Sequence, residues 1–208
     1  MGLNEIWMRY IKDNGADFVH FVDISMLPAD ITHEYSCAVL FGKALTKEFI
    51  KALKNSQKPA CGDEFDKTEH EMDALADMLA DKLNSDSYKS ISNFEFAKLP
   101  HKTIARIAGF GFIGKNTLLI NEEYGCAVIL GKVLTDAPFS LMRTQPKDPL
   151  CGDCNICVDT CPDKALSGKL WNLTICREEM LDEKLCTTCL KCMINCPYTE
   201  RYMEGSCI

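Results

Sequence analysis

The stretch that decides the fold is a cysteine pattern that the chain carries twice. It reads Cys151-Gly-Asp-Cys-Asn-Ile-Cys-Val-Asp-Thr-Cys-Pro162 and, 35 residues later, Cys186-Thr-Thr-Cys-Leu-Lys-Cys-Met-Ile-Asn-Cys-Pro197. Both copies follow the spacing Cys-x2-Cys-x2-Cys-x3-Cys-Pro. The proline lacks an N–H and fixes its own φ, so it is expected to end the local turn after the last cysteine. The repeat predicts a small module with two similar halves.

Eight cysteines at this spacing are candidate ligands for two iron–sulfur clusters. In bacterial ferredoxins, three closely spaced thiolates hold one 4Fe-4S cluster and the fourth cysteine of the run ligates the other cluster. The two predicted ligand sets are therefore Cys151, Cys154 and Cys157 with Cys196, and Cys186, Cys189 and Cys192 with Cys161.

Zinc sites and disulfides are the alternative uses for so many cysteines. Four-thiolate zinc sites usually present their cysteines in pairs, so the third cysteine of each run would be surplus. Disulfides belong mainly to secreted chains. Residues 1–17 have neither an apolar signal core nor a small-residue cleavage site. We therefore expect reduced thiols and a cytoplasmic protein.

Length and composition leave room for a larger domain before the cysteine module. The chain has 208 residues, of which 47% are hydrophobic, enough for an ordinary core. Pro138, Pro146 and Pro149 mark a linker, so we predict domains at residues 1–140 and 141–208. The net charge of −7 argues against a general nucleic-acid binder. No apolar run approaches the roughly 20 residues of a membrane span.

Hydrophobic periodicity predicts an α+β fold in the larger domain. Helices are predicted over residues 4–12, 46–54 and 68–84, the last starting from a capping box at Thr68. A further helix is expected to begin at Pro100 and stop at Gly109. Strands are predicted over residues 17–23, 36–42, 116–121 and 126–130, with a turn at 122–125 from which the last strand returns.

A glycine-rich stretch, Gly109-Phe-Gly-Phe-Ile-Gly114, matches G-x-G-x-x-G without being a dinucleotide-binding fingerprint. That fingerprint follows a strand and opens a helix, whereas this stretch follows a helix and opens a strand. The glycines instead indicate close backbone approach to a bulky ligand, or an unusual turn. Residues 96–121 around them contain no acidic residue, which indicates either a solvated helix face or a phosphate site. The basic side chains of this stretch are Lys98, Lys102, Arg106 and Lys115.

Two longer stretches resemble the epoxyqueuosine reductase family. They are His101-Lys-Thr-Ile-Ala-Arg-Ile-Ala-Gly-Phe-Gly-Phe-Ile-Gly-Lys-Asn-Thr-Leu-Leu-Ile120 and Tyr124-Gly-Cys-Ala-Val-Ile-Leu-Gly-Lys-Val-Leu-Thr-Asp136, followed by the first cysteine run. That family joins a cobalamin-binding α/β domain to a two-cluster ferredoxin domain and is related to corrinoid reductive dehalogenases. The resemblance implies the same order of domains in this chain.

The resemblance also implies further site residues. In the family the glycine loop lies against the corrinoid, so the implied corrinoid-binding residues are Gly109, Gly111, Gly114, Lys115 and Asn116. The family's proton-donating aspartate lies upstream of this loop, and an ungapped count places Glu95 there. The family also takes one cluster ligand at a position that fits Cys176. Local spacing favours Cys186 instead, because it completes the ferredoxin set of three.

Two functions compete. The first is a reductase that passes single electrons through two 4Fe-4S clusters to a corrinoid-bound substrate. A ferredoxin, a flavodoxin or a similar reductase would supply the electrons. The second is an electron-transfer protein that keeps the clusters and has lost corrinoid and tRNA binding. The family's activity implies tRNA as a partner. Its C-terminal helical-repeat segment helps to hold tRNA, whereas this chain stops eleven residues after Pro197.

Overall fold

The computed structural model describes residues 2–55, 63–92, 99–142 and 144–205. They form two compact units, each assembled from three separate segments of the chain. The first, called here the sheet unit, comprises Met1–Ala44, Lys67–Phe110 and Ile129–Pro146. The second, called the cysteine unit, comprises Leu45–Asp66, Gly111–Val128 and Lys147–Ile208. The predicted domains at residues 1–140 and 141–208 stay a prediction.

A four-stranded sheet with the order β1-β2-β6-β3 forms the centre of the sheet unit. Its strands are β1 (Phe18–Asp23), β2 (Cys37–Ala44), β3 (Ser90–Ile91) and β6 (Val128–Thr135). Strands β1 and β2 run antiparallel, with Phe18 opposite Gly42, and β3 pairs antiparallel with β6. The predicted strands at 17–23 and 36–42 are confirmed, and Cys37 is a buried core residue of β2.

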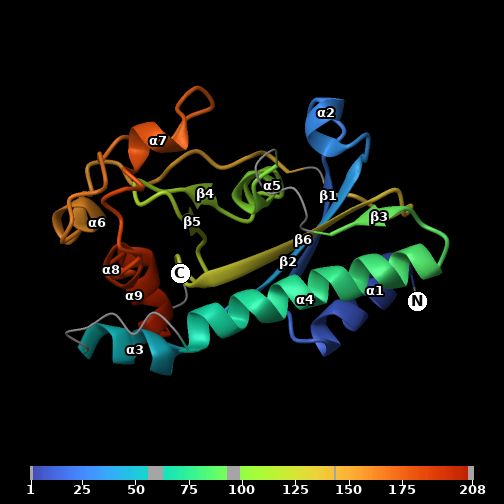
Figure 1. Cartoon of the computed structure of the whole chain (residues 1–208), viewed down its shortest axis with the longest axis horizontal. Helices are drawn as coiled ribbons and strands as arrows, with labels where there is room; N and C mark the ends of the chain where they lie inside the picture. The colour runs from blue at the N-terminus through green and yellow to red at the C-terminus, as the bar shows by residue number, and fades with distance from the viewer. Residues whose placement is uncertain (1, 56–62, 93–98, 143, 206–208) are drawn as a thin grey trace. The chain divides into compact units, whose positions relative to one another are not determined.

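Helices cover both faces of this sheet. Neighbouring residues of a strand point to opposite faces. On β6, Gly131 faces the ring of Phe41 and the backbone of Met72, which belongs to helix α4 (Asp63–Ser85). The next residue, Lys132, donates its amine to the carbonyl of Leu99, just before helix α5 (His101–Ile107). Figure 1 shows α4 and α5 on opposite sides of the strands.

Helix α4 is amphipathic, as predicted, but it begins before the predicted start. Its buried apolar residues repeat at helical spacing and are Met72, Leu75, Ala76, Leu79, Ala80 and Leu83. Thr68 is buried one turn before Met72, so it belongs to the same inward face instead of capping the helix. Helix α1 (Leu3–Asp13) is confirmed and buries Trp7 and Ile11, and Lys82 of α4 lies over the Trp7 ring. A short helix, α2 (Ala29–Thr32), follows β1. No helix in the described ranges is both long enough and apolar enough to cross a membrane.

The cysteine unit contains one confirmed helix and one corrected pair of strands. Helix α3 (Lys47–Asn55) lies where a helix was predicted. The prediction that residues 116–121 and 126–130 form successive strands around a turn was wrong in its pairing. Strand β5 (Leu119–Ile120) pairs back with β4 (Phe112–Ile113), and β6 continues to Thr135 and joins the other sheet. Both runs are apolar, and an apolar run does not specify its partner.

The two cysteine runs fold alike at the third cysteine and differ at the fourth. Cys157 and Cys192 each occupy the second position of a four-residue helix, α6 (Ile156–Asp159) and α8 (Lys191–Ile194). Helix α7 (Arg177–Met180) lies in the insert between the runs. After the second run, Pro197 starts helix α9 (Pro197–Glu204) with Cys196 as its N-cap. The expected role of this proline as a terminator is thus corrected, since proline suits the first turn of a helix.

Candidate iron–sulfur sites

The four cysteines of the first predicted set line one cavity of about 150 Å³. Three of them, Cys151, Cys154 and Cys157, come from the first run, and Cys196 comes from the second. This is the crossed combination that the ferredoxin spacing predicts. The remaining wall includes Lys115, Asn116, Ile120 and Tyr198.

The second set gathers around a small apolar core. Cys161 is buried there with Ala165, Leu166 and Leu181, and Cys186 and Cys192 pack against the same core. Cys189 lies close enough to Cys192 to influence its pKa electrostatically. Because Cys157 also packs against this core, the two candidate sites adjoin.

Backbone N–H groups point at several of the sulfurs. The backbone of Lys115 acts to lower the pKa of Cys151, that of Val158 the pKa of Cys157, and those of Tyr198 and Thr199 the pKa of Cys196. In the second set, the N–H of Ala165 donates to Cys161 Sγ at 3.4 Å. Hydrogen bonds of this kind stabilise thiolates and adjust the reduction potentials of the clusters they hold.

Burial makes these thiols hard to deprotonate unless a cation binds. Burial is the main cause that raises the pKa of Cys157 to about 11 and that of Cys192 to about 12. Metal binding overcomes such a penalty because it replaces the proton with a positive ion. Cys196 behaves differently, since a hydrogen bond with Cys126 lowers its pKa to about 7 despite burial.

The donor set and the cavity together fit an iron–sulfur cluster. Within the described ranges, no three His, Cys, Asp or Glu side chains converge closely enough to hold a single metal ion. The four thiols of the first set surround a volume instead of a point. Such an arrangement suits a group that contains several metal atoms, and the ligand roles of the eight cysteines stay predictions.

Lys115 and Asn116 lie in the wall of the first site. The buried Lys115 amine donates to Asn155 Oδ1 at 2.9 Å, which ties it to the loop between Cys154 and Cys157. The Asn116 amide donates to the Cys192 carbonyl at 3.3 Å. These two residues therefore contact both cysteine runs, and their predicted contact with a corrinoid stays a prediction.

Neighbouring atoms of the chain account for the glycines of the loop. Gly109 has a φ of +67°, and a Cβ there would lie 2.7 Å from Thr144 Oγ1. A Cβ at Gly114 would lie 2.8 Å from Asn116 Oδ1 and closer still to the Ile120 side chain. A Cβ at Gly111 would clash with the Ile120 backbone. The unusual turn that the sequence offered as an alternative explains these positions without a ligand.

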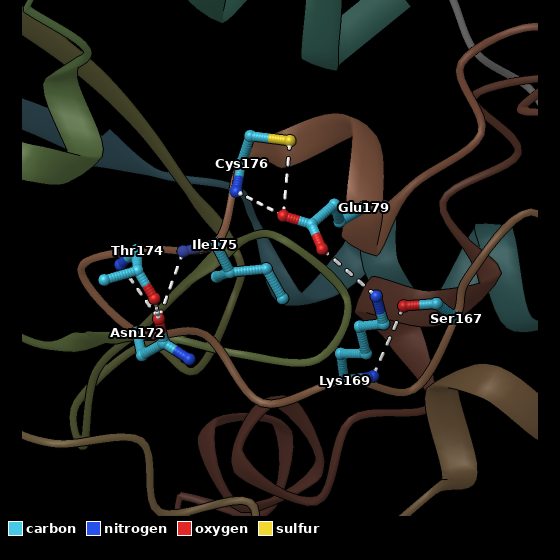
Figure 2. A network of polar contacts seen from close by, with 7 residues as sticks. All are labelled: Ser167, Lys169, Asn172, Thr174, Ile175, Cys176 and Glu179. Atoms are coloured by element: carbon cyan, nitrogen blue, oxygen red, sulfur yellow. Dashed lines mark hydrogen bonds and ion pairs between the residues drawn. The ribbon is translucent and has the colours of Figure 1, made fainter.

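Cys176 lies apart from both sets in a surface loop. Its side chain is exposed, and its sulfur lies 3.6 Å from Glu179 Oε1, which also accepts the Cys176 N–H (Figure 2). The other carboxylate oxygen of Glu179 pairs with Lys169 at 3.2 Å. Since Cys186 packs beside Cys161 and Cys192, the geometry favours Cys186 over Cys176 as the ligand.

The predicted proton donor, Glu95, lies outside the described residues. Further along the chain, the sheet unit contains two shielded basic side chains, the partly buried His101 and the buried Lys132. Burial lowers the pKa of Lys132 to about 8. Burial is also the main cause that lowers the pKa of His101 to about 3, with smaller effects of Lys132 and Lys102. Sequence reasoning did not find this pair, because a lysine within an apolar strand gives no signal of its burial.

The chain resembles known reductases in both fold and sequence. No protein-family model matches it. An epoxyqueuosine reductase solved with an epoxyqueuosine-modified tRNA-Tyr stem loop shares the fold with a TM-score of 0.62 and 20% identity, covering 95% of this chain and 65% of that one. A reductive dehalogenase structure that suggests a mechanism for B12-dependent dehalogenation has a TM-score of 0.59 and 20% identity, covering 74% and 24%. The predicted mixed helix-and-sheet fold is confirmed.

Within this class the sequence is similar to epoxyqueuosine reductase. The enzyme of that name from Listeria monocytogenes is 38% identical over 121 residues, which make up 51% of this chain and 31% of the relative. The predicted resemblance is therefore confirmed, and the match spans less than a third of that relative's length.

Proposed function

We propose that the chain is an iron–sulfur oxidoreductase that passes single electrons through two 4Fe-4S clusters. The observation that carries this proposal is the gathering of four thiols from two separate runs around one cavity. The second set follows the same crossed pattern beside Cys161. Because Cys157 and Cys192 bring the two sites next to each other, an electron on one cluster would be close to the other.

The proposed reaction is the reduction of a corrinoid-bound substrate. The similarity to epoxyqueuosine reductase and the fold shared with a B12-dependent dehalogenase support it. A bound corrinoid would supply the metal centre that delivers electrons to the substrate. The residues proposed to hold it remain Gly109, Gly111, Gly114, Lys115 and Asn116, and Glu95 remains the proposed proton donor.

A second candidate is an electron-transfer protein that does not bind a corrinoid. The observation that favours it is the glycine loop, whose close approaches are to the chain's own atoms. Lys115 and Asn116 likewise contact the cysteine runs. The two candidates share the clusters and differ in the acceptor of the electrons.

Metal analysis tests the clusters, which both candidates require. After anaerobic reconstitution we expect about eight iron and eight sulfide per chain, from two clusters of the 4Fe-4S type. Iron for a single cluster, or zinc at one or two per chain, would refute the proposal.

Cobalamin titration separates the two candidates. A corrinoid that binds the folded chain shifts its own visible spectrum and raises the thermal midpoint by mass action. If neither changes at saturating cobalamin while eight irons are retained, the electron-transfer protein is the correct function.

The proposed partners are an electron donor and a nucleic-acid substrate. The donor would be a ferredoxin, a flavodoxin or a similar reductase, and thirteen cysteines favour a reducing compartment, which we propose is the cytoplasm. The tRNA stem loop bound to the related reductase motivates one substrate assay. Single-turnover reduction of an epoxyqueuosine oligonucleotide should occur with the cobalamin-loaded wild type and slow strongly in Glu95→Gln. Equal rates would remove Glu95 from the mechanism.

A further inference from the structure

Another cysteine of the cysteine unit, Cys126, also lies outside both predicted ligand sets. It precedes β6 in the sequence, where it was predicted to be part of an apolar strand. In the structure it is only 4% exposed, and its side chain contacts that of Cys196. A cysteine held against a cluster ligand can act on the cluster without binding iron.

Two hydrogen bonds fix the position of this residue, and its sulfur lies beside that of Cys196. The Cys126 N–H donates to Thr199 Oγ1 at 3.1 Å, and Thr199 is fully buried. The Asn116 amide donates to Cys126 Sγ at 3.2 Å. The side chain of Cys196 lies beside this sulfur and interacts with it, so an S–H at Cys126 can donate to Cys196 while the Cys126 sulfur accepts from Asn116. The chain is therefore built to aim a buried S–H at one sulfur of the first site.

We propose that Cys126 is a positioning residue that raises the reduction potential of the cluster held by Cys151, Cys154, Cys157 and Cys196. A hydrogen bond donated to a ligand sulfur stabilises the more negative, reduced cluster more than the oxidised one. The matching cysteine of the other set, Cys161, receives a backbone N–H from Ala165 and packs against apolar side chains. The thiol of Cys126 thus distinguishes two clusters whose ligand spacing is identical.

This inference rests on the proposed function, and the test keeps the two apart. Reconstituted wild type, Cys126→Ala and Cys126→Ser are titrated anaerobically with EPR detection, and iron is counted in each sample. In Cys126→Ala we expect one of the two couples to move to a more negative potential while the other stays. The expected change is about tenfold in the oxidised-to-reduced ratio, which corresponds to about 59 mV for one electron.

The serine variant separates hydrogen bonding from packing. Serine keeps a donor at this position, so its couple should stay near the wild-type value. A matched control is Cys37→Ala, which removes a buried thiol from β2 of the sheet unit and should move neither couple. If both couples of Cys126→Ala coincide with those of wild type at eight irons per chain, the inference is wrong and the proposed function stands. If serine and alanine shift the couple equally, packing is responsible and the inference is likewise wrong.

A further variant covers the case in which Cys126→Ala binds fewer than eight irons. Asn116→Leu leaves Cys126 in place and removes the hydrogen bond that directs its thiol. We expect a negative shift of the same couple, and an unmoved couple overturns the inference. If wild type itself forms no clusters, the proposed function fails.

Discussion

The sheet unit and the cysteine-bearing segment, residues 147–205, are stabilised in different ways. In the sheet unit, large apolar side chains are fully buried, among them Ile11, Phe41, Leu79 and Ile104. In the cysteine-bearing segment three of the helices have four residues each, and several large apolar side chains are exposed: Leu150, Ile156, Leu170, Leu173 and Leu185. Isolated helices of one turn are not stable in water. The sheet unit is thus stabilised by its core, whereas the proposed metal–thiolate bonds would supply stability that the segment's own core does not.

Removal of iron should therefore produce the largest difference between the two regions. Anaerobic chelation is expected to abolish amide protection in α6 and α8, because metal binding supplies folding free energy in small metal-binding modules. Strand β2 and helix α4 should stay protected. Hydrogen exchange with mass spectrometry, with and without chelator, measures both regions in one sample. Equal loss of amide protection in the two regions, or no loss in either, would contradict the view that only the cysteine-bearing segment depends on iron.

Substitution of single cysteines should show which thiols of the segment bind iron. Cys186→Ser is expected to lose about half of the eight irons predicted for two clusters, because it removes one thiolate of a set. Cys176→Ser is the matched control and should retain them all, since its exposed sulfur contacts Glu179. Iron and sulfide analysis distinguishes the variants. The reverse result would make Cys176 the ligand, as the family resemblance allowed.

A cavity in the sheet unit should reduce stability without affecting iron. Leu79→Ala removes a fully buried side chain of α4 and is expected to cost about 2–5 kcal/mol of unfolding free energy. Met78→Ala changes an exposed neighbour on the same helix and should have little effect. Denaturant unfolding followed by circular dichroism gives the stability, and iron analysis of the folded protein should give the wild-type value for both. Iron loss in Leu79→Ala would mean that the two regions are not independent.

The last expected effect is a pH dependence of the sheet unit, which is small over any single pH unit. The pKa of His101 is lowered to about 3, chiefly by burial. Below about pH 6.5, His101 therefore binds a proton in the unfolded chain but stays neutral in the folded chain. Stability should fall with pH between about 6.5 and 3, by at most about 1.4 kcal/mol per pH unit. The difference in unfolding free energy between wild type and His101→Gln should shrink as the pH falls. A constant difference would contradict a histidine that stays neutral in the folded chain.

The sequence predicted most helices and strands of the sheet unit because their apolar periodicity is strong. Helix α1, strand β1 and strand β2 differ from their predicted ranges by at most two residues at either end. The start of α4 was missed because Thr68 looks like a cap until its burial is known. The partner of β5 was missed because two neighbouring apolar runs can pair with each other or with strands elsewhere.

The candidate sites were predictable to the extent that local spacing determines them. The spacing of each run also gave the crossed arrangement of Cys161 and Cys196, which the structure reproduces geometrically. Cys126 was not predictable as a neighbour of Cys196, because 70 residues separate them and no motif relates them. Long-range contacts of this kind depend on the path of the chain between the two residues.

The division of the cysteine unit into three segments has a consequence for the order of folding. Residues 45–66 and 111–128 leave the ribosome well before residues 147–205, with which they form one compact unit. Contacts between segments so distant in sequence close large loops and form slowly. Until the last segment has been synthesised, buried groups such as Ile50 and Phe112 lack their final neighbours and are open to aggregation or chaperone binding. Cluster insertion is then expected to be a late step that follows synthesis of the second cysteine run.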